Sequence, residues 1–100
     1  MNAEFDFQLP KGLVSDGELH DHGSMRLLTA KDELIVQELA NRDRNLDLVF
    51  LLMSQAITKL GSLTKVTPQH LEQLFLPDFV YLQDFFGQVQ PKNVTTAGES

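Results

Sequence analysis

The sequence predicts an α+β fold, in which a small N-terminal antiparallel hairpin or three-stranded sheet packs on about four helices. Three observations support this prediction: strand-like alternation near the start, helical periodicity in the middle, and proline-marked helix starts in the last third. One hundred residues with 42% hydrophobic content can bury one modest core. We therefore predict a single domain over residues 1–90 and a disordered polar tail over residues 91–100.

The N-terminal segment has the pattern of paired strands. Apolar and polar residues alternate over residues 5–9, as in a strand with one buried face, and Pro10 is expected to end or bend this strand. The Ser15-Asp16-Gly17 sequence then predicts a hairpin turn, because glycine tolerates positive φ. Residues 25–28 are predicted to add a third strand.

A first helix and a long central helix are predicted next. Thr29 is a helix cap, and the acidic residues that follow it suit the positive end of the helix dipole. Residues 41–45 contain no apolar side chain and form a polar junction. Apolar residues then recur at helical spacing over residues 46–60, which predicts the central helix, with Gly61 just beyond its C-terminus.

Two further helices are predicted in the last third of the chain. Thr67 places a capping hydroxyl before Pro68, whose missing N–H is not needed in the first helical turn, and Leu76-Pro77-Asp78 starts a helix in a related way. From this layout we predict a core that includes Leu27, Leu34, Val49, Phe50, Met53, Ile57, Leu60, Leu71, Leu74, Phe79 and Leu82.

The composition excludes several classes of function. A net charge of −6 and scattered lysines argue against nucleic-acid binding, which depends on clustered basic residues. The start carries acids where a signal peptide would carry Lys or Arg, and the longest apolar stretch is too short to span a bilayer. The absence of cysteine fits a reducing compartment. We therefore predict a cytosolic protein with neither nucleic acid nor membrane as a partner.

No residue pattern points to catalysis. His20-Asp21-His22 alone resembles a metal site, because alternation along a strand would place both imidazoles on one face, but two ligands do not make a site. Asp32 and Glu33 point about 100° apart on a helix and are better explained by capping. We predict no catalytic residue, no metal and no cofactor, and keep a His20- and His22-dependent hydrolase as the enzyme alternative.

The apolar stripe of the central segment is wider than one small neighbouring element would cover, so this helix is either buried on several sides or shared with another chain. Aromatic residues are dense in the two helices that follow. A homodimer interface over the central helix is one way to cover this surface. The predicted protein-binding residues are Leu48, Leu51, Leu52, Phe75, Phe79, Tyr81, Phe85 and Phe86.

Four segments together form a more specific pattern: F-D-F-Q-L-P-K-G-L-V-S-D-G-E-L-H, M-R-L-L-T-A-K-D-E-L, I-T-K-L-G-S-L-T-K-V-T-P and F-V-Y-L-Q-D-F-F. Over about residues 5–88 this combination resembles a family of small tail-assembly proteins of contractile phages and related contractile injection systems. Arg26, Thr29 and Asp32 also match the spacing of the R-x-x-T/S-x-x-D/E-L-like helix start of tail-assembly chaperones. The same spacing is an ordinary helix entry.

The resemblance implies a strand-rich start followed by helices and a role in building a tail tube, sheath or baseplate, with no catalytic residue. The main hypothesis is a non-enzymatic assembly factor that binds a tape measure or tube subunit through its helical apolar surface. It would act in the bacterial or phage-infected cytoplasm or remain in the particle. The alternatives are a permanent structural subunit of the tail or baseplate and an acidic regulatory binding protein such as an antitoxin.

Overall fold

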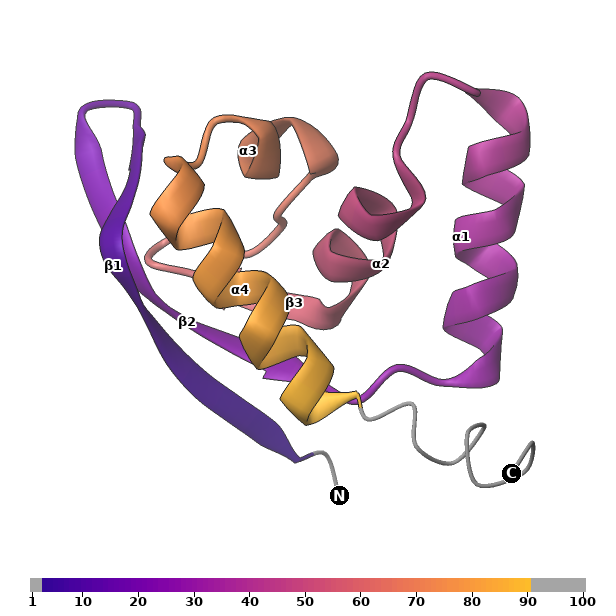
Figure 1. Cartoon of the computed structure of the whole chain (residues 1–100), viewed down its shortest axis with the longest axis horizontal. Coiled ribbons are helices and arrows are strands. Elements are labelled where there is room, and N and C mark those ends of the chain that lie inside the picture. The colour runs from indigo at the N-terminus through magenta and orange to yellow at the C-terminus, as the bar shows by residue number, and fades with distance from the viewer. Residues whose placement is uncertain (1–2, 91–100) are drawn as a thin grey trace.

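An antiparallel sheet and a group of helices make up the α+β fold, as the sequence predicts (Figure 1). The computed structural model describes residues 3–90, so the predicted tail over residues 91–100 lies outside the described residues. The elements follow in the order β1 (Glu4–Ser15), β2 (Glu18–Arg26), α1 (Ala30–Arg42), α2 (Leu48–Ala56), β3 (Ile57–Leu60), α3 (Pro68–Glu72) and α4 (Leu76–Val89).

The predicted N-terminal hairpin is confirmed. Strands β1 and β2 pair antiparallel around Asp16 and Gly17, whose φ values of 53° and 76° suit the two-residue turn that matches strand twist. Strand β1 continues past Pro10, because the pairing register shifts between Gln8 and Leu13 and this irregularity accommodates the proline. Pro10 therefore interrupts the regular pairing without ending the strand.

The third strand differs from the prediction. Residues 25 and 26 end β2, and the third strand is β3, which forms from the last residues of the predicted central helix. The helix α2 accordingly ends at Ala56. Strand β3 pairs with β2 at Gly23, where the missing side chain lets the backbone approach: a Cβ there would lie 2.6 Å from the Lys59 carbonyl oxygen. Ile57 and Thr58 are β-branched, which favours a strand over a helix. The chain therefore pairs here with the open edge of β2 instead of forming another helical turn.

Helix α4 covers one face of the hairpin and forms the main core with it. Rings of Phe7 in β1 and Phe85 in α4 meet edge-to-face with centroids 5.5 Å apart. The buried core cluster comprises Phe7, Leu9, Leu13, Met25, Met53, Ala56, Ile57, Leu60, Val66, Leu71, Leu82 and Val89. Of the predicted core, Met53, Ile57, Leu60, Leu71 and Leu82 are confirmed, while Phe50, Leu74 and Phe79 pack partly buried against it.

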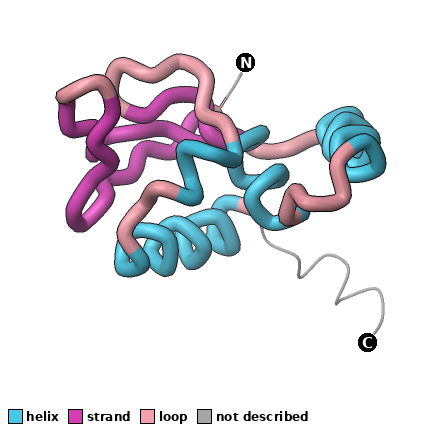
Figure 2. Tube along the Cα trace, turned by 90° about the horizontal axis from the view of Figure 1, so that it is seen from above, coloured by secondary structure: helices cyan, strands magenta, loops and turns pink. Residues whose placement is uncertain are grey.

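Three predicted core residues are wrong. Leu27, Leu34 and Val49 are 50%, 69% and 39% exposed. Helix α1 packs on α2 at one end of the molecule, away from the hairpin, as the view from above shows (Figure 2). Val36 is its buried apolar residue, so Leu34, two positions earlier on the helix, points toward solvent.

The predicted helix starts are confirmed at Thr29 and Thr67, which both form capping boxes. The Thr67 hydroxyl accepts from the His70 backbone N–H at 3.3 Å, and the Thr67 backbone N–H donates to His70 Nδ1 at 3.0 Å. Pro77 lies in the first turn of α4, as predicted. His70 therefore completes the capping box at the start of α3.

Gly61 follows β3 instead of a helix, and its substitution should be destabilising. Its φ is 61°, and a Cβ at this position would overlap the ring of buried His20. We expect Gly61→Ala to lower the free energy of unfolding by about 2–3 kcal/mol, from backbone strain plus this overlap. Gly17→Ala is the matched control, because Gly17 also has positive φ but nothing lies within 4 Å of its added Cβ. Equal losses in urea denaturation would exclude a role for the His20 contact.

Candidate protein-binding groove

The predicted binding residues do not form one continuous surface. Leu51 is 3% exposed, which corrects its predicted surface role, because α2 packs on both α1 and α3. Phe79 and Phe85 are partly buried against the core, where Phe79 contacts Phe50 with ring centroids 4.9 Å apart. The Tyr81 hydroxyl accepts from the Gln8 backbone N–H at 3.3 Å. These residues therefore take part in internal packing.

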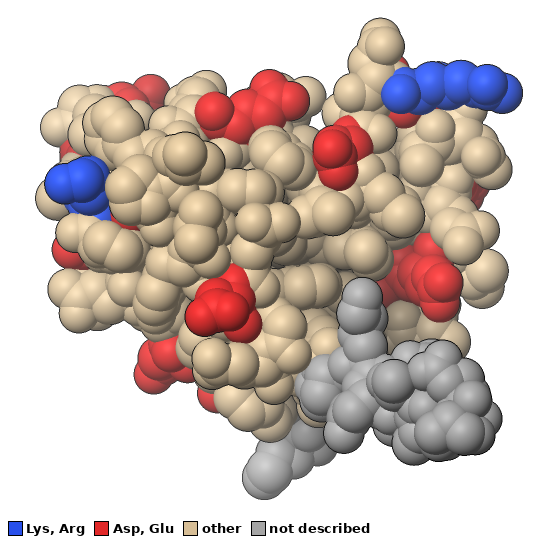
Figure 3. Space-filling view, viewed as in Figure 1, with Lys and Arg blue, Asp and Glu red and all other residues tan. Residues whose placement is uncertain are grey.

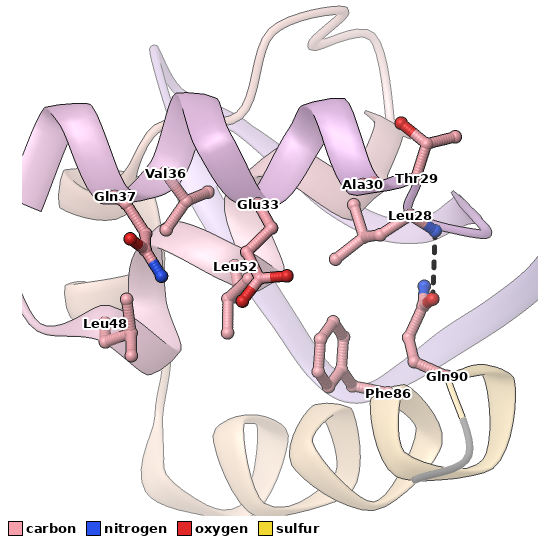
Figure 4. A pocket seen from close by; sticks show the side chains of 10 residues that line it. All are labelled: Leu28, Thr29, Ala30, Glu33, Val36, Gln37, Leu48, Leu52, Phe86 and Gln90. Carbon is pink, nitrogen blue, oxygen red and sulfur yellow. Dashed lines mark hydrogen bonds between the residues drawn. The ribbon is translucent and has the colours of Figure 1, made fainter. Parts of the chain in front are cut away.

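The remaining predicted residues separate into two places. Leu48, Leu52 and Phe86 line one groove between α1, α2 and α4 (Figure 4). Phe75 instead lies at the N-terminal end of α4, where it is 57% exposed beside the more exposed Leu76. The fold thus brings together residues from α2 and α4 that are more than thirty positions apart in the sequence.

The groove has a volume of about 420 Å³, within the range of sites that hold small ligands or anchoring side chains. One wall comes from Leu28 and the first turns of α1, including Val36. Leu48 and Leu52 of α2 and Phe86 of α4 supply the other apolar surface, and their side chains point into the space between the helices (Figure 4). Leu48 is 51% exposed, so the groove opens to solvent.

An ion-pair cluster fixes the start of α1, and so one wall of the groove. Arg26 at the end of β2 donates two hydrogen bonds of 2.8 Å to the Asp32 carboxylate. The same carboxylate accepts from the Thr29 backbone N–H at 2.7 Å and from Gln55 Nε2 at 3.0 Å. These bonds join the ends of β2 and α2 to the first turn of α1.

This cluster changes the titration of Asp32. Hydrogen bonding from the Arg26 guanidinium is the largest cause that holds the pKa of the Asp32 carboxyl well below its usual range, and the bonds from Thr29 and Gln55 add to it against burial. The R-x-x-T-x-x-D spacing thus places Arg26, Thr29 and Asp32 so that they hydrogen-bond to one another at the start of α1. These residues position the groove without lining it, apart from Thr29.

Gln90 closes one end of the groove, and sequence reasoning missed this role. Its Nε2 donates to the Arg26 carbonyl oxygen at 2.6 Å, and its Oε1 accepts from the Leu28 backbone N–H at 3.0 Å (Figure 4). The side-chain amide thereby ties the end of α4 to the connection between β2 and α1. A polar residue at a helix end carries no sequence signal for such a partner sixty positions earlier.

Glu33 is the one ionisable residue among the side chains that line the groove. Its carboxylate points toward the space beside Leu52 (Figure 4), and it forms no ion pair with another residue of the described chain. Acidic surface is also more extensive than basic surface on the face drawn in Figure 3. The groove is therefore apolar with one anionic position on its α1 side.

The two strand histidines occupy different environments. His20 is 4% exposed and its Nδ1 accepts from the Ser62 backbone N–H at 3.3 Å, whereas His22 is exposed and bonds Asp21 at 2.9 Å. Gly61 lies against the His20 ring, whereas the His22 side chain is exposed, so the two histidines do not share one accessible surface although they alternate along β2. Within residues 3–90, no three His, Cys, Asp or Glu side chains are grouped so as to hold a metal ion.

No protein-family model matches the chain, and neither curated proteins nor solved structures match it. None of the helices described between residues 3 and 90 has the length and apolar character needed to cross a membrane.

Proposed function

We propose that this protein is a non-enzymatic tail-assembly factor that holds an apolar segment of another tail protein, such as a tape measure or tube subunit, in the groove between α1, α2 and α4. The observation that carries the proposal is the groove itself, with exposed Leu48 at its mouth and Leu52 and Phe86 inside it. The resemblance to tail-assembly proteins supplies the biological setting. A chaperone of this kind would cover its client until assembly begins.

The proposal is tested by photo-crosslinking in cells that produce tails. A photoreactive amino acid at residue 48 should crosslink to a tail protein in the soluble fraction, and the crosslinked peptide should be apolar. The same residue at position 34, on the solvent side of α1, is the control, because Leu34 is also exposed but does not line the groove. Equal crosslinking from both positions, or no tail protein at position 48, would contradict the proposal.

The second candidate is a permanent subunit of the tail or baseplate. A separate exposed apolar surface on α4 favours it, since Phe75, Leu76 and Val80 are 57%, 72% and 55% exposed. Quantitative mass spectrometry of sedimented particles separates the two candidates. Fixed stoichiometry in mature particles would identify a subunit, whereas presence only in the soluble fraction would identify an assembly chaperone.

A matched pair of substitutions assigns binding to one of these surfaces. Leu48 and Leu76 are each the first residue of a helix and are 51% and 72% exposed, so aspartate at either position should leave the fold intact. We expect Leu48→Asp to weaken binding of the crosslinked partner about tenfold or more, and Leu76→Asp to change it little. Isothermal titration calorimetry measures both. The reverse result would move the binding site to the α4 surface.

A further inference from the structure

We propose that the occupant of the groove is an amphipathic α-helix that carries Lys or Arg beside its apolar face, and that this cation pairs with Glu33. The inference rests on the proposed function, because it names the partner chemistry of the same groove. It makes Glu33 the residue that selects among apolar segments.

The lining of the groove favours a helical occupant. Its walls are side chains from α1, α2 and α4 and from the connection before α1, with no strand edge among them. The Leu28 backbone N–H already donates to Gln90 Oε1. An extended segment in the groove would therefore find no backbone ladder, and those of its N–H and C=O groups that face the apolar walls would stay unpaired. A helix satisfies these groups internally and presents apolar residues at i, i+3, i+4 and i+7.

The charges around the groove favour a basic occupant. Glu33 is the ionisable group of the lining, and no described cation neutralises it. A second hollow, of about 740 Å³, is lined in part by Leu27 of the same β2–α1 connection, and its lining includes Glu4 and Asp6 but no Lys or Arg. The ionisable side chains that line these two hollows are all acidic, so an acidic partner seated there would meet like charge, whereas Lys or Arg on a partner helix finds complementary charge.

The geometry also places the ion pair at the rim. Glu33 is exposed and lies on α1, across the groove from Leu48 and Leu52. A helix whose apolar face contacts Leu52 and Phe86 would turn its flank toward α1, where a long Lys or Arg side chain reaches a carboxylate while keeping its stem on apolar surface. The ion pair then fixes the register of the helix, and apolar contact supplies most of the affinity.

The test uses a displayed library of helical peptides of eighteen residues. Their apolar positions are fixed as Leu at i, i+3, i+4 and i+7 spacing, and the flanking positions vary among Lys, Gln and Glu. The targets are the full chain, Glu33→Gln, Glu33→Lys and Leu48→Asp, with Asp84→Asn as the control for net charge. Asp84 is exposed on α4 and lines none of the hollows described above.

The expected result is selection of Lys at one flank by the natural chain and by Asp84→Asn. Glu33→Gln should lose this preference, and Glu33→Lys should select Glu at the same flank. For the best natural-chain binder, Glu33→Lys should weaken binding about tenfold or more at low salt, with a smaller difference at high salt.

Two outcomes overturn the inference in different ways. If peptides bind and Leu48→Asp abolishes their binding, but the selected flank does not change with residue 33, the groove keeps its proposed function and the charge selection by Glu33 is wrong. If no helical peptide binds in a Leu48-dependent manner, the helical occupant is wrong. Failure of the photo-crosslinking experiment in addition would remove the proposed function as well.

Discussion

Replacing Asp78 with alanine should lower the free energy of unfolding by about 3–5 kcal/mol, a large share of the stability of a small domain. Asp78 is fully buried in the first turn of α4, and its two carboxylate oxygens accept from the backbone N–H groups of Lys11 and Gly12 at 2.8 and 2.9 Å. The substitution leaves two backbone donors unpaired at the register shift of β1, where the neighbouring strand does not satisfy them.

Urea denaturation followed by circular dichroism measures this effect. Asp84→Ala on the exposed side of the same helix is the control and should change stability by no more than about 0.5 kcal/mol. Asp78→Asn should fall between the two, because its amide oxygen replaces one acceptor while its NH₂ group faces the other N–H donor. A loss below about 1 kcal/mol in Asp78→Ala would mean that the β1 segment relaxes and finds other partners.

Replacing Asp32 with asparagine should lower the free energy of unfolding by about 2–4 kcal/mol at pH 7. The Asp32 side chain is 8% exposed and holds Arg26, Thr29 and Gln55 through charge-assisted hydrogen bonds. Asparagine cannot accept both hydrogen bonds of the guanidinium, which leaves Arg26 only partly satisfied. The start of α1 should therefore loosen, and peptide binding in the groove should weaken with it.

The loss should depend on pH in a defined direction. Hydrogen bonding from Arg26 lowers the pKa of Asp32 in the folded protein, whereas the unfolded chain has an ordinary aspartate pKa of about 3.9. The stabilisation is therefore complete above about pH 5 and is lost as the pH falls through the lower folded pKa. The stability difference between the natural chain and Asp32→Asn should shrink as the pH falls below about 4.

A surface ion pair provides the control for this second prediction. Glu38 and Arg42 lie one turn apart on α1, and their side chains are 67% and 71% exposed. Glu38→Gln should cost no more than about 0.5 kcal/mol at pH 7. A difference between the natural chain and Asp32→Asn that stays constant from pH 7 to about pH 2 would show that the carboxylate charge does not carry the stabilisation.

Parts of the candidate groove could be anticipated from the sequence, but its assembly could not. Helical spacing marked Leu48, Leu52 and Phe86 as surface candidates, yet the same reasoning included Leu51, which is buried. Apolar periodicity identifies residues that prefer contact, and it does not say whether the contact lies inside the chain or outside it. The roles of Glu33 and Gln90 depend on segments that lie far apart in the sequence.

The sequence by itself determined the features that depend on near neighbours. The turn at Asp16 and Gly17 needs only residues that accept positive φ, and the caps at Thr29 and Thr67 use hydroxyls that reach a backbone N–H three residues ahead. The alternation over residues 5–9 likewise predicted the burial of Phe7 and Leu9, although Phe5 on the same face is 36% exposed. These features depend on local sterics and short-range hydrogen bonds, so they can be predicted without knowledge of the fold.

The tertiary structure alone decided the outcomes that depend on distant partners. Residues 57–60 continue a helical pattern, but the open edge of β2 beside Gly23 offered them backbone pairing, and they became β3. Asp78 resembles an ordinary first-turn acid until β1 places two unpaired N–H groups against it. In both cases the deciding free energy belongs to hydrogen-bonding groups more than thirty residues away, which are brought close only when the chain has folded.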